Sequence, residues 1–491
     1  MSPAGLRGLL RAIPVAARVC AVVAFANAAC WSIATPAFQG ADEQAHFAYT
    51  QVLAQTGKLP SSSAETFSPE EDLALTDEHF REVVLNPTRT PLASRRQARL
   101  LQHDLALHAP RHGNGAAGVA VSQPPLYYAL QSIPYALGAG GTLLDRLELM
   151  RLFSALLAGI TALFVFLFLR EALPAAPWAW TAGALAAALA PLLGFTSSAV
   201  NPDALLLTVS AAIFCVLARA FRHGLTRRLA LALGALLAAG FLTKLNFLGL
   251  APGVFVGLAL LTRRQARAPC AGSGPYRAAA LAVAIALTPV LAYVARNLLT
   301  HRAGLGLLSN ALHATAGHGS ITAEISYVWQ LYLPRLPGMT NDFPGISTTF
   351  QIWFKGFVGR YNWLETVFPN GVYDLALLPA ATIGALSVRA LWLGREALRA
   401  RLPELATYVL MTGGVMTLTA ADSYLMFPNL DAGVSEPRYM MPMLALGAAV
   451  LALAARGAGR RFGRAAGALI VLLILTHNAA SLLLEISRYY G

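Results

Sequence analysis

The sequence predicts an all-α protein that crosses a membrane many times. Of its 491 residues, 56% are hydrophobic and only 12% are charged, whereas soluble domains carry about 25% charged residues. The mean hydropathy is +0.55, and apolar runs long enough to span a bilayer recur along the chain. These observations exclude an ordinary soluble fold, and the first partner that they indicate is the lipid bilayer.

The net charge of +13 does not by itself indicate a nucleic-acid partner. Basic residues of membrane proteins concentrate in cytoplasmic loops, so their position along the chain matters more than their sum. Only three of the 37 basic residues are lysines, namely Lys58, Lys244 and Lys355. This scarcity makes the position of each lysine informative, and we expect no nucleic-acid partner.

The first apolar run predicts an uncleaved transmembrane helix. It extends from Ile13 to about Ala34 and, at about 22 residues, is longer than the apolar part of a signal peptide. Arg7 and Arg11 precede it, which favours a cytoplasmic N-terminus.

The next apolar stretch, 122–141, is interrupted by prolines and glycines. If it does not span, nearly every arginine cluster of the later turns falls on the cytoplasmic side, as the positive-inside rule requires. We therefore expect a re-entrant or interfacial segment and a first outer loop, 36–148, with interfacial helices.

The later apolar runs predict ten further crossings, so that one integral-membrane domain over residues 1–491 has about eleven spans. A second outer loop, 300–371, is rich in aromatic residues, which favour the membrane interface. The later spans are expected at about 149–170, 176–195, 202–220, 229–247, 248–262, 278–299, 372–393, 403–420, 438–455 and 464–484.

The segment that follows the first span, PAFQGADEQAHFAY (36–49), is the first candidate for chemistry. A helix that starts near Ala41 would place Asp42, His46 and Tyr49 on one face. A carboxylate at the rim of a membrane is costly unless it is used. An ordinary helix N-cap explains the same aspartate equally well.

Three more polar features fall on the same, outer side in this topology. Asn201-Pro202-Asp203 precedes a span, although such residues are also common helix start signals. Lys244 and Asn246 lie where the long apolar run 229–262 must turn, and a lysine there could simply reach the interface. Arg438 and Tyr439, in the segment EPRY, begin a late span. An arginine on the outer side runs against the positive-inside trend.

Carboxylates and cations that meet at one membrane face indicate a reaction between a hydroxyl and an anionic group. A carboxylate can accept the proton of an attacking hydroxyl, and Lys or Arg can hold a phosphate and stabilise its charge as it leaves. These residue types alone do not define the reaction.

The order of these motifs resembles the GT-C superfamily of membrane glycosyltransferases, which includes protein O-mannosyltransferases and the lipid A aminoarabinose transferase. The similar features are the Asp-Glu pair after the first helix, PPLYY (124–128), LMRLFSALLAGIT (149–161), SSAVNPDAL (197–205), Lys244 and EPRYMMP (436–442). In the residues of these segments, the chain most resembles an uncharacterised bacterial family of predicted membrane proteins within that group.

The resemblance implies a multi-pass enzyme of the bacterial inner membrane with its active site on the outer face. A sugar would move from a polyprenyl phosphate to a hydroxyl of a lipid, glycan or protein. Asp42 would be the general base or, in some relatives, a metal ligand for Mg²⁺ or Mn²⁺, and Glu43 its partner. Lys244 and Arg438 would bind the donor phosphate. Further candidates for the site are His46, Tyr128, Asp203, Asn246 and Tyr439.

Two other classes of protein fit the same residues. A transporter or flippase of lipid-linked sugars would bind the same phosphate without needing a base, but its ionisable residues are expected near mid-membrane. A non-catalytic subunit for the assembly of cell-envelope polymers is also compatible, because a fold does not establish an activity.

Overall fold

The structure, a computed structural model, describes residues 13–84, 86, 95–107, 109–267, 273–300, 321–426 and 436–490. Arg7 and Arg11, on which the predicted side of the N-terminus depends, lie outside these residues. The part 301–320 of the second predicted outer loop lies outside them as well.

The prediction of an all-α, polytopic membrane protein is confirmed. In the part of the chain that the structure describes, eight helices are long and apolar enough to cross a membrane. They are α2 (Val15–Ala34), α8 (Leu143–Ala172), α11 (Asp203–His223), η2 with α13 (Leu245–Gly249 and Ala251–Ala266), α14 (Gly274–Leu299), α18 (Asn370–Leu393), η4 with α21 (Pro437–Met443 and Leu444–Gly457) and α22 (Gly459–Tyr490).

The remaining three predicted crossings are helical but are not among these eight. They are α9 (Pro177–Ala188), α12 (Arg227–Phe241) and α20 (Leu402–Met426). With 12 and 15 residues, α9 and α12 are shorter than the about 20 residues of a full span. The 25-residue α20 is long enough, but it is rich in threonine and glycine. Within the described residues, length and composition alone thus support eight of the eleven predicted spans.

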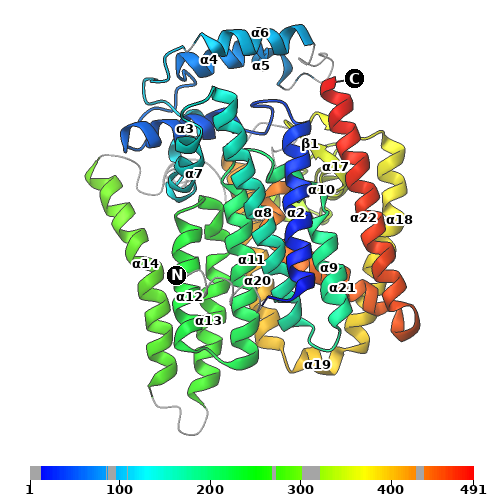
Figure 1. Ribbon diagram of the computed structural model, residues 1–491. Coiled ribbons are helices and arrows are strands. Elements are labelled where there is room, and N and C mark those ends of the chain that lie inside the picture. The colour runs from blue at the N-terminus through cyan, green and yellow to red at the C-terminus, as the bar shows by residue number, and fades with distance from the viewer. Residues whose placement is uncertain are drawn as a thin grey trace.

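Shorter elements gather at the two ends of the bundle (Figure 1). Figure 1 shows α3 to α7 together at one end, here called the loop end, and α19 at the opposite end. The first outer segment forms α3 (Glu43–Thr56), α4 (Pro69–Asp77), α5 (Phe80–Val83), α6 (Arg95–Ala106), η1 (Gly118–Ser122) and α7 (Leu126–Leu137). The others are α10 (Pro191–Thr196), α16 (Ile321–Tyr332), η3 (Thr348–Phe354), α17 (Lys355–Gly359), β1 (Arg360–Tyr361), β2 (Thr366–Val367) and α19 (Arg395–Arg399).

The segment 122–141 contains a helix that is short for a membrane span. Helix α7 has 12 residues and includes Pro134; it lies at the loop end beside α3 (Figure 1). Its first residue, Leu126, donates its backbone N–H to the carbonyl of Leu242 at 2.9 Å. This bond attaches α7 to the turn that follows α12.

The turns that carry the arginine clusters lie together at the other end of the bundle. Figure 1 places there the connections from α8 to α9, from α11 to α12 and from α21 to α22, the end of α13, the start of α14, and α19. We call this the arginine end. The positive-inside rule makes it the expected cytoplasmic end and makes the loop end the expected outer end.

Polar side chains connect the first described helix to the last. Trp31 on α2 donates its indole N–H to Asn478 Oδ1 on α22 at 3.1 Å, and the Asn478 amide donates to Asn27 Oδ1 at 2.8 Å. One turn nearer the loop end, the Thr35 hydroxyl donates to Glu485 at 3.0 Å. These buried bonds hold α2 and α22 in one register, since polar groups inside a membrane bundle need partners.

Candidate functional site

Asp42 immediately precedes helix α3, and its backbone has the left-handed conformation, with φ 61° and ψ 13°. The helix begins at Glu43, two residues later than expected, and the Asp42 side chain makes no capping hydrogen bond. Left-handed backbone is costly for a residue other than glycine, although Asp tolerates it better than most. The ordinary N-cap interpretation therefore does not account for this aspartate.

The Asp42 carboxylate instead belongs to a cluster of ionised groups at the loop end. Arg438 Nη2 lies 3.1 Å from Asp42 Oδ2, and Arg438 also pairs with the carboxylate of Glu436. Lys244 Nζ lies 2.7 Å from Asp203 Oδ1, and Arg438 Nε lies 4.0 Å from Asp203 Oδ2. The structure thus brings together four of the segments that the sequence singled out.

Within this cluster, Asp42 is the most accessible group. Its side chain is 27% exposed, compared with 13% for Glu436 and 8% for each of Lys244 and Arg438. The side chain of Asp203 is only 4% exposed, and its Oδ2 has no hydrogen-bond partner. A molecule that reaches the cluster would meet Asp42 first.

Asparagine 201 holds the Asp203 segment against the Asp42 loop. Its amide donates to the carbonyl of Ala41 at 3.2 Å, and its Oδ1 accepts the backbone N–H of Asp203 at 2.9 Å. The motif Asn201-Pro202-Asp203 is therefore more than a helix start signal, because it also fixes the distance between the two carboxylates.

Electrostatics keeps Asp42 ionised and His46 neutral. Burial raises the pKa of Asp42, but the charges of Arg438 and Lys244 and the hydrogen bond from Arg438 outweigh it, so the pKa lies below its ordinary value. Burial is also the largest effect on His46 and lowers its pKa to about 3, despite the opposing charge of Asp42. At neutral pH the histidine is uncharged, and its Nδ1 lies 2.9 Å from the hydroxyl of Tyr128.

The tyrosine of this pair is itself rigidly held. The ring of Tyr128 stacks on that of Tyr49 with 3.6 Å between centroids. Tyr49 in turn donates its hydroxyl to the carbonyl of Gln123 at 3.2 Å. His46 and Tyr128 thus form a fixed, neutral pair next to the charged cluster, and Tyr128 comes from the segment PPLYY.

Glu43 is not an accessible partner of Asp42, contrary to the role expected from the sequence. Its side chain is fully buried, and Arg151 of α8 donates to its two oxygens at 2.7 and 2.5 Å. The backbone N–H of Val200 donates to the same carboxylate at 2.9 Å. Glu43 therefore acts as an anchor that joins α3, α8 and the segment before α11, since charged groups inside a bundle must be paired.

Tyr439 and Asn246 complete the set of predicted residues. The amine of Lys244 lies 5.5 Å from the centre of the Tyr439 ring, and the guanidinium of Arg438 lies 5.4 Å from it. Such distances permit a cation–π attraction. Asn246 is half-buried in η2 and makes no side-chain hydrogen bond to the described residues. The structure gives Tyr439 a direct contact with the cluster and gives Asn246 none.

Glu436 was not among the predicted site residues. In an α-helix, residues two apart face different directions, so the spacing between Glu436 and Arg438 gave no reason to pair them. The backbone of Glu436 is extended, with φ −94° and ψ 137°, and the next residues form the 3₁₀-helix η4. This geometry turns both side chains toward each other. Burial raises the pKa of Glu436, and the charge of Arg438 opposes this effect.

Metal binding has no direct support from the described residues. Among them, no three His, Cys, Asp or Glu side chains come together in a way that could hold a metal ion. Within the cluster, the cations of Lys244 and Arg438 pair with the three carboxylates of Asp42, Asp203 and Glu436.

A cavity of about 530 Å³ lies at the loop end and is lined in part by Arg151. Its apolar lining includes Ile33 and Leu152, and its polar lining includes Glu78 and Glu148. Asp42 does not line it. Within this lining, Arg151 pairs with Glu43.

Gly40 permits the close approach of the Asp42 loop to the segment before α11. A Cβ atom at this position would lie 2.5 Å from the Cβ of Ala199.

We predict that Gly40→Ala separates Asp42 from Asp203 and costs about 1–3 kcal/mol of stability, as overpacking does. Thermal unfolding and ligand binding of the purified variant check this. Adding Ala199→Gly removes the clash and should restore both stability and ligand binding. A double variant as defective as Gly40→Ala would show that the contact with Ala199 is not the cause.

Fold and site together define a polytopic α-helical membrane protein with an ionic cluster at one end of its bundle. Residues 25–447 match the family described as "Predicted membrane protein (DUF2142)", and the chain belongs to this family. No curated protein and no solved structure matches it.

Proposed function

We propose that the protein is a membrane glycosyltransferase that moves a sugar from a polyprenyl phosphate to a hydroxyl of a lipid, glycan or protein. The observation that carries the proposal is the cluster itself. An accessible, ionised carboxylate, Asp42, lies beside two buried cations, Lys244 and Arg438. The order of the motifs, which resembles the GT-C superfamily, supports the same class of reaction.

In this reaction the acceptor hydroxyl attacks the anomeric carbon of the donor sugar with inversion. Asp42 accepts the proton of the hydroxyl. The bond between the anomeric carbon and the phosphate oxygen breaks, and the polyprenyl phosphate leaves with the electron pair. Lys244 and Arg438 stabilise the charge that develops on this phosphate.

The pairing of the cations adds a requirement to this mechanism. Arg438 is shared between Asp42 and Glu436, and Lys244 is paired with Asp203. A donor phosphate must compete with these carboxylates for both cations. When it draws Arg438 away from Asp42, the pKa of Asp42 rises and the carboxylate becomes a stronger base. Donor binding would thereby prepare the general base.

The same pairing predicts a shift of the pH profile in Arg438→Gln. Asp42 acts as a base only when it is deprotonated, so the rate falls as the pH drops through its pKa. Arg438 lowers this pKa in the free protein. Without Arg438 the pKa of Asp42 rises, because its largest opposing charge and a hydrogen bond are lost, so the acid limb of the kcat/KM profile moves to higher pH. An acid limb that stays in place would show that Arg438 does not set the pKa of the catalytic base.

The position of the cluster favours an enzyme over a transporter. Its residues lie at the ends of elements: Asp42 precedes α3, Asp203 begins α11, Lys244 precedes η2 and Arg438 lies in η4. Transporters hold their substrates near the middle of the membrane, between broken helices.

A transfer assay on the purified protein tests the proposal. Tritiated polyprenyl-phosphate sugars are offered in detergent together with a membrane lipid and glycan extract. We expect tritium to appear in an acceptor product. If the donor binds but its sugar is never released, a transporter or a non-catalytic assembly subunit becomes the better explanation.

A further inference from the structure

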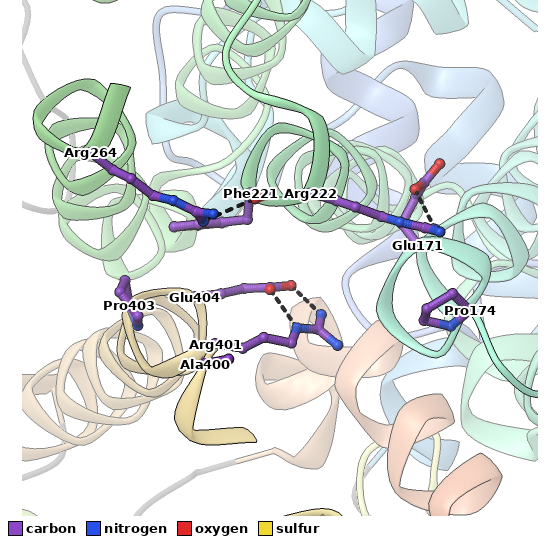
Figure 2. Close-up of a pocket in the computed structure, with 9 residues that line it drawn as sticks. All are labelled: Glu171, Pro174, Phe221, Arg222, Arg264, Ala400, Arg401, Pro403 and Glu404. Carbon is purple, nitrogen blue, oxygen red and sulfur yellow. Dashed lines mark hydrogen bonds and ion pairs between the residues drawn. The ribbon is translucent and has the colours of Figure 1, made fainter. Parts of the chain in front are cut away.

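A second polar cavity lies at the arginine end, far from the Asp42 cluster along the bundle. It has a volume of about 220 Å³ and is lined by residues from the ends of α8, α11 and α13 and from the start of α20. Figure 2 shows its lining residues, which are Glu171, Pro174, Phe221, Arg222, Arg264, Ala400, Arg401, Pro403 and Glu404.

The charges that line this cavity are not balanced. Three arginines face two glutamates, which leaves one positive charge in excess. Arg401 donates to both oxygens of Glu404 and to the carbonyl of Ala172, so its charge is paired with that of Glu404. The excess therefore belongs to the other two arginines.

Arg222 and Arg264 keep unused hydrogen-bond donors. Arg222 Nη1 donates to Glu171 at 3.2 Å, and Arg264 Nη1 donates to the carbonyl of Phe221 at 3.2 Å. A guanidinium has five N–H donors, and the others on these two residues meet no acceptor among the described residues. Two such groups on neighbouring helices suit an anion with several oxygens, because arginine binds phosphate with paired hydrogen bonds.

Two more features point to the same ligand. The first turn of the 25-residue helix α20 lines the cavity, and the N-terminus of this helix carries a partial positive charge. Its volume is smaller than the about 300–1,000 Å³ of sites that enclose a whole small molecule, so it fits a headgroup. Pro174, Phe221 and Pro403 supply an apolar wall against which the carbon atoms next to a phosphate can pack.

We propose that this cavity binds a phosphodiester or phosphate group between Arg222 and Arg264, with Glu171 as the carboxylate that competes for Arg222. At the expected cytoplasmic end of a membrane bundle, the headgroup of an anionic phospholipid supplies this chemistry, and basic pockets between helix ends are suited to it. A soluble phosphate supplies the same chemistry from the cytoplasm. The inference does not depend on the sugar-transfer reaction.

Native mass spectrometry of the full-length protein in detergent tests the proposal, with phosphatidylglycerol as the probe and phosphatidylcholine as the zwitterionic control. We expect the protein to retain phosphatidylglycerol in preference to phosphatidylcholine. Arg222→Gln and Arg264→Gln should each weaken this binding about fivefold, the effect of one basic residue near an anionic headgroup. Arg228→Gln, which removes an exposed arginine outside the cavity from the same end of the bundle, should leave binding unchanged.

Glu171→Gln provides a variant with a gain of binding, which misfolding cannot mimic. It releases Arg222 from its carboxylate, so phosphatidylglycerol should bind more tightly. Inorganic phosphate is tested in parallel by thermal unfolding. Protection by phosphate with the same dependence on Arg222, Arg264 and Glu171, and none by the lipid, would establish the site with a soluble ligand. Equal lipid and phosphate binding in wild type, Arg222→Gln, Arg264→Gln and Glu171→Gln would overturn the proposal.

Discussion

Asp42→Asn is expected to lower sugar transfer by about 10²–10⁴-fold, the contribution of a positioned general base. The amide has nearly the same shape as the carboxylate but cannot accept the proton of the acceptor hydroxyl. Asparagine also tolerates the left-handed backbone of this position. The variant should therefore fold, insert and still bind the polyprenyl-phosphate donor.

Asp72→Asn is the matched control, because Asp72 is an exposed carboxylate on α4 at the same end of the bundle. Tritiated transfer rates, donor binding and thermal unfolding are compared for the two variants and the wild type. Full activity of Asp42→Asn would remove Asp42 from the mechanism. Loss of both donor binding and activity would indicate a role in binding rather than in proton transfer.

Arg151→Met is expected to cost about 3–5 kcal/mol of stability, because it leaves the buried carboxylate of Glu43 without its countercharge. Of its partners among the described residues, Glu43 would keep only the N–H of Val200, and the carbonyls of Ser32, Thr35 and Pro36 would lose the donors that Arg151 supplies. The segment that carries Asp42 is held by these bonds. Thermal unfolding in detergent should show a large loss, with transfer activity lost in parallel.

The double variant Glu43→Gln, Arg151→Met tests whether the charges of this pair, rather than the packing of the two side chains, stabilise the protein. It contains no unpaired charge, so it should recover part of the stability that Arg151→Met loses. If the double variant is as unstable as the sum of the two single variants, Glu43 and Arg151 do not stabilise the protein as an ion pair.

The sequence predicted the helical class and most helix positions, because the hydropathy of an apolar run is an average over many neighbouring residues. It predicted full-length spans where alanine-rich runs form the shorter helices α9 and α12. Hydropathy records how apolar a run is, whereas the length of the helix also depends on residues such as Pro191, which begins α10 soon after α9 ends.

The candidate site was predicted in outline, because topology alone places Asp42, Asp203, Lys244 and Arg438 at one end. Their pairing was not predictable, since it depends on backbone geometry such as the extended conformation of Glu436. The role of Glu43 could have been inferred from one further signal. Arg151 lies within a 30-residue apolar helix, and an arginine there requires a buried carboxylate nearby.

The bonds between α2 and α22 bear on how the chain is assembled during synthesis. Asn27 and Trp31 lie on α2, the first helix that the structure describes, and Thr35 follows its end, yet their partners Asn478 and Glu485 are made about 450 residues later. At about 5–20 residues per second, α2 waits on the order of a minute for these two partners. During this interval the nascent bundle is open on one side, and a membrane chaperone or the insertion machinery would have to shield it.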